Sequence, residues 1–165
     1  MAITLARVDD RVIHGQTTTR WSVLRPVDSI LVISDDVAKD SLRRKVVKAA
    51  AGNLKVGIYT VEQGVEALSK VAKSTKNFFI ISDQIEYFAE LKKLGGDFGS
   101  ELNIGNLTGT REGTKNMGRS VTLNEKDYEA CEYLVDQGVD IQFQLLPDDE
   151  IRHWPTLKKK YESLT

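Results

Sequence analysis

Short β-rich apolar runs alternate with longer amphipathic stretches along the chain, and this alternation restricts the possible folds more than any other feature. Runs such as ILVI (30–33) and FFII (78–81) are apolar at successive positions, which is typical of strands buried on both faces. Strands that alternate with helices predict right-handed β–α–β crossovers. We therefore predict an α/β fold: an open, doubly wound, mainly parallel sheet with helices on both faces and a small antiparallel edge.

The pattern also places the elements along the chain. Residues 95–120 are glycine-rich and have little helical periodicity, so we predict loops, short strands and an antiparallel edge pair there. The first helix is expected to begin at Gln16, and Pro155 should end or kink the last one. The predicted strands are 3–8, 29–34, 55–60, 77–82, 102–106, 120–123 and 140–146, and the other predicted helices are 36–51, 61–73, 84–94, 124–137 and 148–163.

Length and charge narrow the class of protein. A chain of 165 residues suits one domain, predicted over residues 1–165. The formal net charge of -1 gives no reason to expect nucleic acid or an anionic membrane as a partner. The apolar runs are too short to span a bilayer, and the N-terminus does not resemble a signal peptide. A single cysteine excludes an internal disulfide and the usual zinc clusters. These features predict a cytoplasmic protein.

One of only two histidines lies where the first strand ends and the first helix begins, in RVDDRVIHGQTTTRW (7–21). Ligands of such sheets bind beyond the carboxyl ends of the strands. The free N–H groups of a first helical turn favour anions, and an arginine can grip a phosphate with two hydrogen bonds. We predict that His14, Arg11 and Asp10 are catalytic, Asp9 or Asp10 orienting the imidazole or Arg11.

The same loop has the parts needed to bind phosphate. We expect Gly15, Gln16 and Thr17 to contribute, since Gly15 allows close approach of the backbone and Thr17 adds a hydroxyl. Nearby positive groups disfavour imidazolium, and a neutral, nucleophilic His14 could form a phosphohistidine. It could equally bind an anion passively.

Other polar residues have simpler explanations. Asp35, Asp36 and Asp83 follow strands and are expected to cap helices and shape the cleft, and no metal site is predicted. Cys131 lies on the apolar side of a predicted helix and should be a buried structural thiol. His153 is expected at the surface.

Several segments of the sequence resemble those of a known family. RVDDRVIHGQ, followed by TTTRW, resembles the active-site segment of the IIB components of the mannose–fructose–sorbose family of the bacterial sugar phosphotransferase system. SILVISDDVAKD, LNIGNLTG and VTLNEKDYEACEYLVDQGVDIQFQLLP resemble later segments of that family. Asn106 stands where glycine is commoner in the family.

The resemblance implies a cytoplasmic phosphoryl carrier that needs no cofactor. The histidine matching His14 accepts a phosphoryl group from a phosphohistidine of the IIA component. It then passes the group to a sugar imported by the membrane components IIC and IID. Arg11 matches the family's phosphate-facing arginine and Asp10 its neighbouring acid. Because the chain starts at the first strand, IIA is expected to be a separate protein.

Several alternatives stay open at this stage. A non-catalytic anion-binding or regulatory module of the same fold would use the same loop. A nucleotide- or phosphosugar-handling enzyme is disfavoured, since no G-x-G-x-x-G follows the first strand. Residues 107–119 are either part of a docking surface or a solvated loop. The sugar is not readable from the sequence, and a homodimer would be unsurprising.

Overall fold

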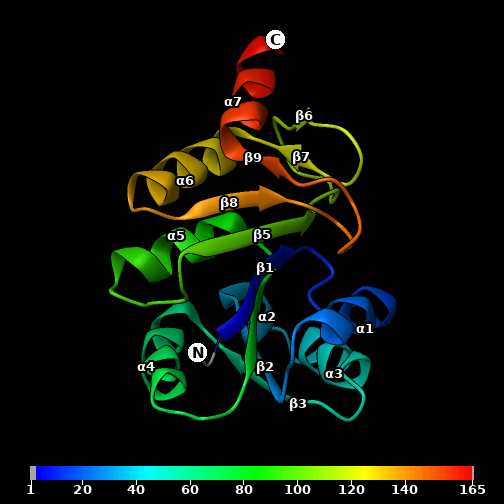
Figure 1. The fold of residues 1–165 in the computed structure, drawn as a ribbon, viewed down its shortest axis with the longest axis vertical. Helices are drawn as coiled ribbons and strands as arrows, with labels where there is room; N and C mark the ends of the chain where they lie inside the picture. The colour runs from blue at the N-terminus through cyan, green and yellow to red at the C-terminus, as the bar shows by residue number, and fades with distance from the viewer. Residues whose placement is uncertain (1–2, 165) are drawn as a thin grey trace.

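The protein, described here by a computed structural model over residues 3–164, is built around a seven-stranded sheet with the order β3-β2-β4-β1-β5-β8-β9 (Figure 1). Every neighbouring pair is parallel except β8 and β9. The strands are β1 (Ile3–Asp9), β2 (Ser29–Ile33), β3 (Lys55–Tyr59), β4 (Phe78–Ser82), β5 (Glu101–Asn106), β8 (Asp140–Phe143) and β9 (Arg152–His153). The predicted fold class is confirmed, but its antiparallel edge is β9 and does not come from residues 95–120, where it was predicted.

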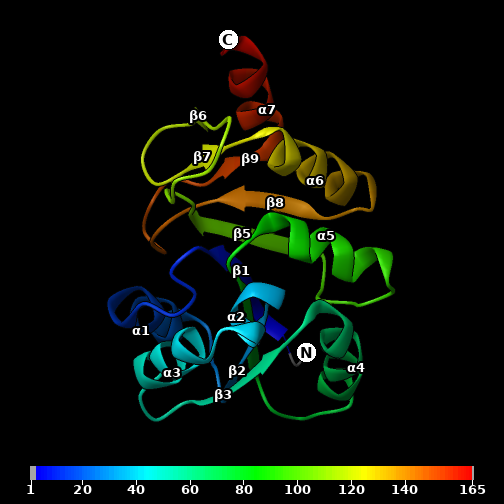
Figure 2. The same ribbon diagram turned by 180° about the vertical axis from the view of Figure 1, so that it is seen from behind.

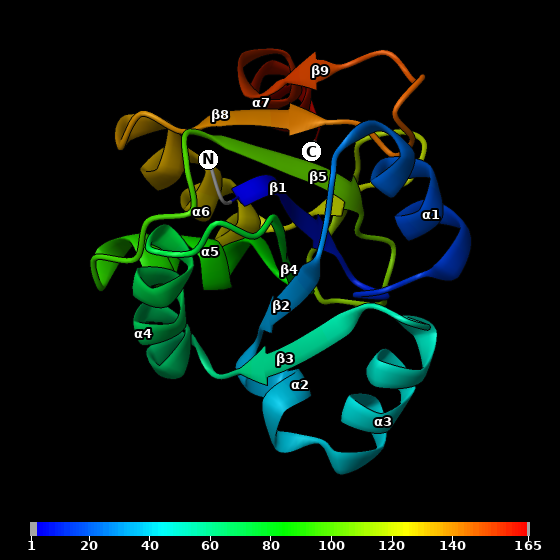
Figure 3. The same ribbon diagram turned by 60° about the horizontal axis from the view of Figure 1, so that its bottom comes forward.

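Helices cover both faces of the sheet (Figures 2 and 3). Crossovers from β1 to β2 and β3 place α1 and α3 on one face, whereas the crossovers back toward β5 and β8 place α4, α5 and α6 on the other. The crossovers that leave the neighbouring strands β1 and β5 therefore run in opposite directions, and ligands bind in such sheets at a switch point of this kind. The helices are α1 (Gly15–Leu24), α2 (Asp35–Lys39), α3 (Ser41–Ala50), α4 (Val61–Ala72), α5 (Ile85–Lys93), α6 (Glu125–Asp136) and α7 (Trp154–Ser163).

Two apolar clusters, one on each face of the sheet, hold these layers together. Side chains of a strand alternate between faces, so Leu5 packs with Trp21 under α1 while Val8 joins the cluster under α4, α5 and α6. Both Leu5 and Val8 are buried. Arg7 and Asp9 share the face of Leu5 by the same alternation, which turns these two charged residues toward α1.

The prediction of one helix over 36–51 is wrong. Asp40 adopts an extended conformation and its Oδ1 accepts the backbone N–H groups of Leu42 and Arg43 at 3.0 and 3.1 Å. An aspartate that caps a new helix from an extended backbone ends the preceding one. The segment is consequently divided into α2 and α3.

The prediction of a helix over 148–163 with Pro155 inside it is also wrong. Arg152 and His153 form the antiparallel edge strand β9, and the helix begins at Trp154 with Pro155 in its first turn. Proline is well suited to that position, where its missing N–H would have no intrahelical partner. No kink is therefore needed.

The glycine-rich region forms a small separate sheet and not an edge of the main one. β6 (Lys115–Asn116) pairs antiparallel with β7 (Thr122–Leu123). Thus the run predicted as strand 120–123 is shorter than expected and lies outside the seven-stranded sheet. Over residues 3–164, we find no helix with the length and apolar character needed to cross a bilayer.

Candidate functional site

His14 occupies the junction between β1 and α1 that the sequence indicates. It is the N-cap of α1, with an extended backbone (φ -121°) and a half-buried ring. Its side chain makes no capping hydrogen bond to the helix. The ring is therefore available for other contacts at the carboxyl edge of the sheet.

The start of α1 has open backbone donors. The first N–H bonded within the helix is that of Thr18, which donates to the His14 carbonyl at 2.9 Å. Within residues 3–164, the N–H groups of Gly15, Gln16 and Thr17 make no hydrogen bond. Three unpaired donors at a helix N-terminus attract an anion. The predicted phosphate-binding residues thus lie together beside His14.

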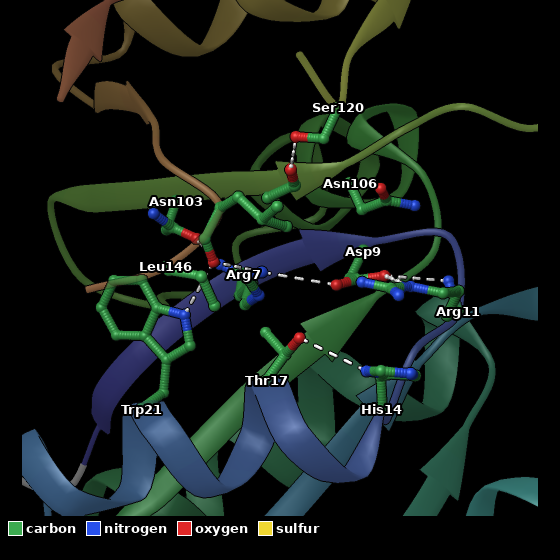
Figure 4. A network of polar contacts seen from close by, with 12 residues as sticks. Arg7, Asp9, Arg11, His14, Thr17, Trp21, Asn103, Asn106, Ser120 and Leu146 are labelled. Carbon is green, nitrogen blue, oxygen red and sulfur yellow. Dashed lines mark hydrogen bonds and ion pairs between the residues drawn. The ribbon is translucent and has the colours of Figure 1, made fainter. Parts of the chain in front are cut away.

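Among the predicted phosphate-binding residues, Thr17 contacts the imidazole of His14. Its side chain is 7% exposed, and its Oγ1 lies 3.4 Å from His14 Nδ1 (Figure 4). Gln16 is exposed at the rim. A Cβ added at Gly15 would meet no atom within 4 Å, so the glycine is not required by the packing of the protein alone.

Arg11 is held in place by Asp9. The Asp9 Oδ1 accepts the backbone N–H of Arg11 at 3.0 Å and its Nε at 3.4 Å. The Asp9 side chain is 2% exposed, whereas that of Arg11 is 40% exposed. The buried Asp9 carboxylate therefore binds the Nε side of the Arg11 guanidinium and leaves the opposite side facing solvent (Figure 4).

The hydrogen bonds of the Asp10 side chain lead to the loop after β5. Its Oδ2 accepts the backbone N–H groups of Thr108 and Gly109 at 2.9 and 2.8 Å, and its Oδ1 accepts Asn106 Nδ2 at 2.6 Å. Asp9, not Asp10, contacts Arg11. The structure gives neither acid a hydrogen bond to the imidazole, and Asp10 binds the loop that follows β5.

A strained turn connects these residues. Val12 has a φ of 64°, and its N–H donates to the Asp9 carbonyl at 2.8 Å. A β-branched residue in the left-handed region costs on the order of 1–3 kcal/mol and persists only where its surroundings impose it. The buried Val12 side chain supplies that constraint, and the turn brings Arg11 back toward His14.

These side chains line one surface depression. Arg11, His14, Gly15, Gln16 and Thr17 share it with Thr19, Arg20, Leu145 and Leu146. Leu145 and Leu146 belong to the loop after β8, and they are half-buried. The depression therefore has a cationic and hydrogen-bonding floor with an apolar wall on one side.

Sequence reasoning missed the buried residues that support the loop. Arg7 contacts Asp9, and its guanidinium also bonds Asn103 on the neighbouring strand β5. A charged residue at an inward position of a buried strand was the available signal, because such residues are rarely buried unless they are paired. The motif NIGN (103–106) supplies the matching partners for Arg7 and Asp10.

The remaining predictions concern residues outside the depression. Asp35 accepts the Val61 N–H at 2.8 Å and Asp83 pairs with Arg43 at 3.2 Å, so both act within the fold. Cys131 is fully buried, as predicted, and burial raises the pKa of its thiol. His153 is exposed and lies 3.0 Å from Asp140.

The loop 107–119 is tied to the fold at several points. Arg111 bonds Asp127 at 2.6 Å and the Thr122 carbonyl at 2.7 Å, and Met117 is fully buried. Arg111 is thereby engaged in an internal ion pair. This part of the loop is an integrated structural element, in contrast to the freely solvated loop that was one of the two alternatives.

Open helix amides, a half-exposed arginine and a half-buried histidine at the switch point of a doubly wound sheet are the features of an α/β protein that handles phosphoryl groups. The family described as PTS system sorbose subfamily IIB component matches residues 3–165. The sorbose-specific EIIB component of Lacticaseibacillus casei is 33% identical over 150 residues, covering 90% of each chain. The fructose-specific EIIB component of Bacillus subtilis is 31% identical over 150 residues, covering 90% of this chain and 91% of that one.

Solved structures agree with these sequence relatives. The crystal structure of the IIBSor domain of the sorbose permease from Klebsiella pneumoniae superposes with a TM-score of 0.87 at 30% identity and covers 99% of both chains. The protein belongs to the sorbose-subfamily IIB components of the sugar phosphotransferase system. It is accordingly a phosphoryl-carrier subunit of a sugar-specific phosphotransferase system, as the sequence resemblance implied.

Proposed function

We propose that His14 is the residue that carries the phosphoryl group, accepting it from the IIA component and passing it to a sugar. The observation that carries this proposal is the placement of the His14 imidazole beside three unpaired helix amides and the outer side of Arg11. In the first step a ring nitrogen of His14 attacks phosphorus. The phosphorus–nitrogen bond of the donor breaks and its electron pair returns to the donor imidazole.

In the second step the group leaves His14 for the sugar. A sugar hydroxyl oxygen attacks phosphorus, the bond to the His14 nitrogen breaks, and the hydroxyl proton passes to a base or to solvent. The amides of Gly15, Gln16 and Thr17 would bind the equatorial phosphoryl oxygens, and Arg11 would balance their charge. No metal or organic cofactor takes part in this scheme.

The partners follow from the same scheme. A IIA component meets the depression first, and the membrane components IIC and IID, with the sugar bound, meet it second. The carrier would thus work at the inner face of the membrane. Because one surface serves two partners in turn, each complex should be short-lived. The apolar wall made by Leu145 and Leu146 would give both partners a common contact.

The test is transfer of labelled phosphate from phosphoenolpyruvate through the general proteins of the system and its IIA component. We expect one acid-labile, base-stable phosphate on the wild-type chain and none on His14→Gln, with His153→Gln labelled like the wild type. Label on His14→Gln would overturn the assignment. Phosphate binding without any covalent label would favour a non-catalytic anion-binding module.

A further inference from the structure

Beneath the depression lies a buried cation that the proposed phosphoryl transfer does not itself use. Arg7 lies on the α1 face of β1, is 3% exposed, and has its guanidinium carbon 5.4 Å from the centre of the Trp21 ring. Burial lowers the pKa of Arg7 to about 10, so it remains a cation at neutral pH. A buried charge is costly unless the surrounding groups match it.

Both terminal nitrogens of the Arg7 guanidinium have hydrogen-bond acceptors. Nη1 donates to the side chain of Asn103 and to the Gln144 carbonyl, the latter at 3.2 Å. Nη2 donates to the Leu145 carbonyl at 3.0 Å and to Asp9 Oδ2 at 3.4 Å. Gly105 leaves the necessary room, because a Cβ there would overlap the guanidinium. A lysine has one nitrogen and cannot reach all four acceptors in this way.

The hydrogen bonds of Arg7 reach both the cationic floor and the apolar wall of the depression. Asp9 uses its Oδ2 for Arg7 and its Oδ1 for Arg11. Leu145, whose carbonyl binds Arg7, lines the depression together with His14. Arg7 is therefore connected to the phosphate-facing arginine through one carboxylate and to the apolar wall through one carbonyl.

The charge balance gives this arrangement a chemical consequence. Without Arg7, the nearly inaccessible Asp9 carboxylate would have Arg11 as its only side-chain cation among residues 3–164. The guanidinium of Arg11 would then be drawn inward to the carboxylate and would be less available to a phosphoryl group. With Arg7 present, Asp9 holds Arg11 only by its backbone N–H and Nε.

We propose that Arg7 is a positioning residue for phosphoryl transfer, which acts through Asp9 to keep the outer nitrogens of Arg11 turned toward His14. This inference rests on the proposed role of His14. It predicts that Arg7 and Arg11 are energetically coupled in the transfer reaction. A residue that merely stabilises the fold would slow transfer equally with or without Arg11.

The experiment is a double-mutant cycle on the single-turnover rate of transfer from the phosphorylated IIA component. We expect Arg7→Lys to slow transfer about 30-fold in the wild-type background, since small displacements of a charged group cost up to ~10²-fold. In an Arg11→Ala background the same change should cost less than about threefold. The IIA concentration giving half-maximal rate should stay within about threefold, because binding is left to the surface residues.

A second cycle with Asp9→Asn keeps the test independent of how well Arg7→Lys folds. Asn has the shape of Asp without its charge, and the slowing that Asp9→Asn causes should likewise fall below about threefold in an Arg11→Ala background. Equal slowing in both backgrounds for the variants that fold would overturn the inference while wild-type labelling at His14 leaves the proposed function intact. Label persisting on His14→Gln would instead remove the proposed function.

Discussion

Two neighbouring strand ends carry almost the same ion pair and differ in what surrounds it. At the end of β1, Asp9 is 3.4 Å from Arg11, and just beyond β4, Asp83 is 3.2 Å from Arg43. The aspartate side chains are 2% and 7% exposed and the arginine side chains 40% and 37%. The two strands are paired in parallel, with Val8 opposite Ser82. Burial and pair geometry alone therefore do not distinguish Arg11, which we propose acts in transfer, from Arg43.

The two ion pairs differ in the groups behind the carboxylate, on the buried side, and in those in front of the guanidinium, on the exposed side. Behind Asp9 stands Arg7, whereas Asp83 Oδ1 is buried without a hydrogen-bond partner among residues 3–164. In front, Arg11 faces the open amides of α1, whereas the first amides of α3 near Arg43 are occupied by Asp40. Of these two aspartate–arginine pairs, the one that we propose as part of an anion site lies beside the helix end without a side-chain cap.

The largest expected effect separates the two arginines. Arg11→Ala should slow transfer to His14 by about 10²-fold, the usual cost of removing one donor to a transferring anion. Arg43→Ala should lower the free energy of unfolding by about 1–3 kcal/mol, because it leaves Asp83 buried without its cation, and should leave the transfer rate nearly unchanged. Transfer rates and urea unfolding of both variants measure this. A similar loss of rate in both would show that Arg11 has no special role.

The next effect tests the buried cation behind Asp9. Gly105→Ala would force a Cβ into the Arg7 guanidinium, and overpacking of this kind costs about 1–3 kcal/mol. Transfer should also slow, because Arg7 must move away from Asp9. Gly15→Ala is the matched control for urea unfolding alone, since nothing lies within 4 Å of its added Cβ. Unchanged urea unfolding of Gly105→Ala would contradict the packing described here.

A smaller effect is expected for the acid that faces the loop after β5. Asp10→Ala removes a carboxylate that accepts three hydrogen bonds, and the unpaired donors should cost about 1–3 kcal/mol. Asp35→Ala removes the acceptor of the Val61 N–H and should cost about 1 kcal/mol. If Asp10→Ala slows transfer without any change in thermal or urea unfolding, Asp10 acts in the chemistry and not through the loop.

The smallest effect concerns the hydroxyl beside the imidazole. Thr17→Val removes the Oγ1 that lies 3.4 Å from His14 Nδ1, and loss of one weak hydrogen bond should slow transfer by up to about fivefold. Thr18→Val, one residue further along α1, is the control and should transfer at the wild-type rate. A pH–rate profile of both variants would show whether Thr17 affects the protonation of His14. Identical profiles and rates for the two would exclude such a role.

Much of the fold could be predicted because its signals are local. Buried runs in β2 and β4 are apolar at successive positions, and Asn124 and Gly138 bound α6 as expected, with a capping box at Asn124 and a positive φ of 88° at Gly138. The errors at 36–51 and 148–163 arose at helix starts: Asp40 caps α3 and Pro155 lies in the first turn of α7, and both were predicted to lie inside a longer helix.

The site could be predicted in part for the same reason. His14 and Arg11 stand in one short segment beside a helix start, so their proximity follows from the chain itself. The roles of Asp9 and Asp10 could not be separated from the sequence. Adjacent residues at a strand end point in different directions, and the sequence does not show which direction leads to Arg11. Which of the two meets Arg11 depends on the face on which α1 packs.

The sequence by itself determined the alternation of strands and helices, the histidine at the first helix start and the family to which the chain belongs, all of which depend on neighbouring residues. Tertiary structure decided which partner each charge meets. Asp10 bonds Asn106 across 96 residues and Arg7 bonds Leu145 across 138. Such contacts arise only when β1, β5 and the loop after β8 lie side by side, since hydrogen bonds act over a few ångströms in space and are insensitive to distance along the chain.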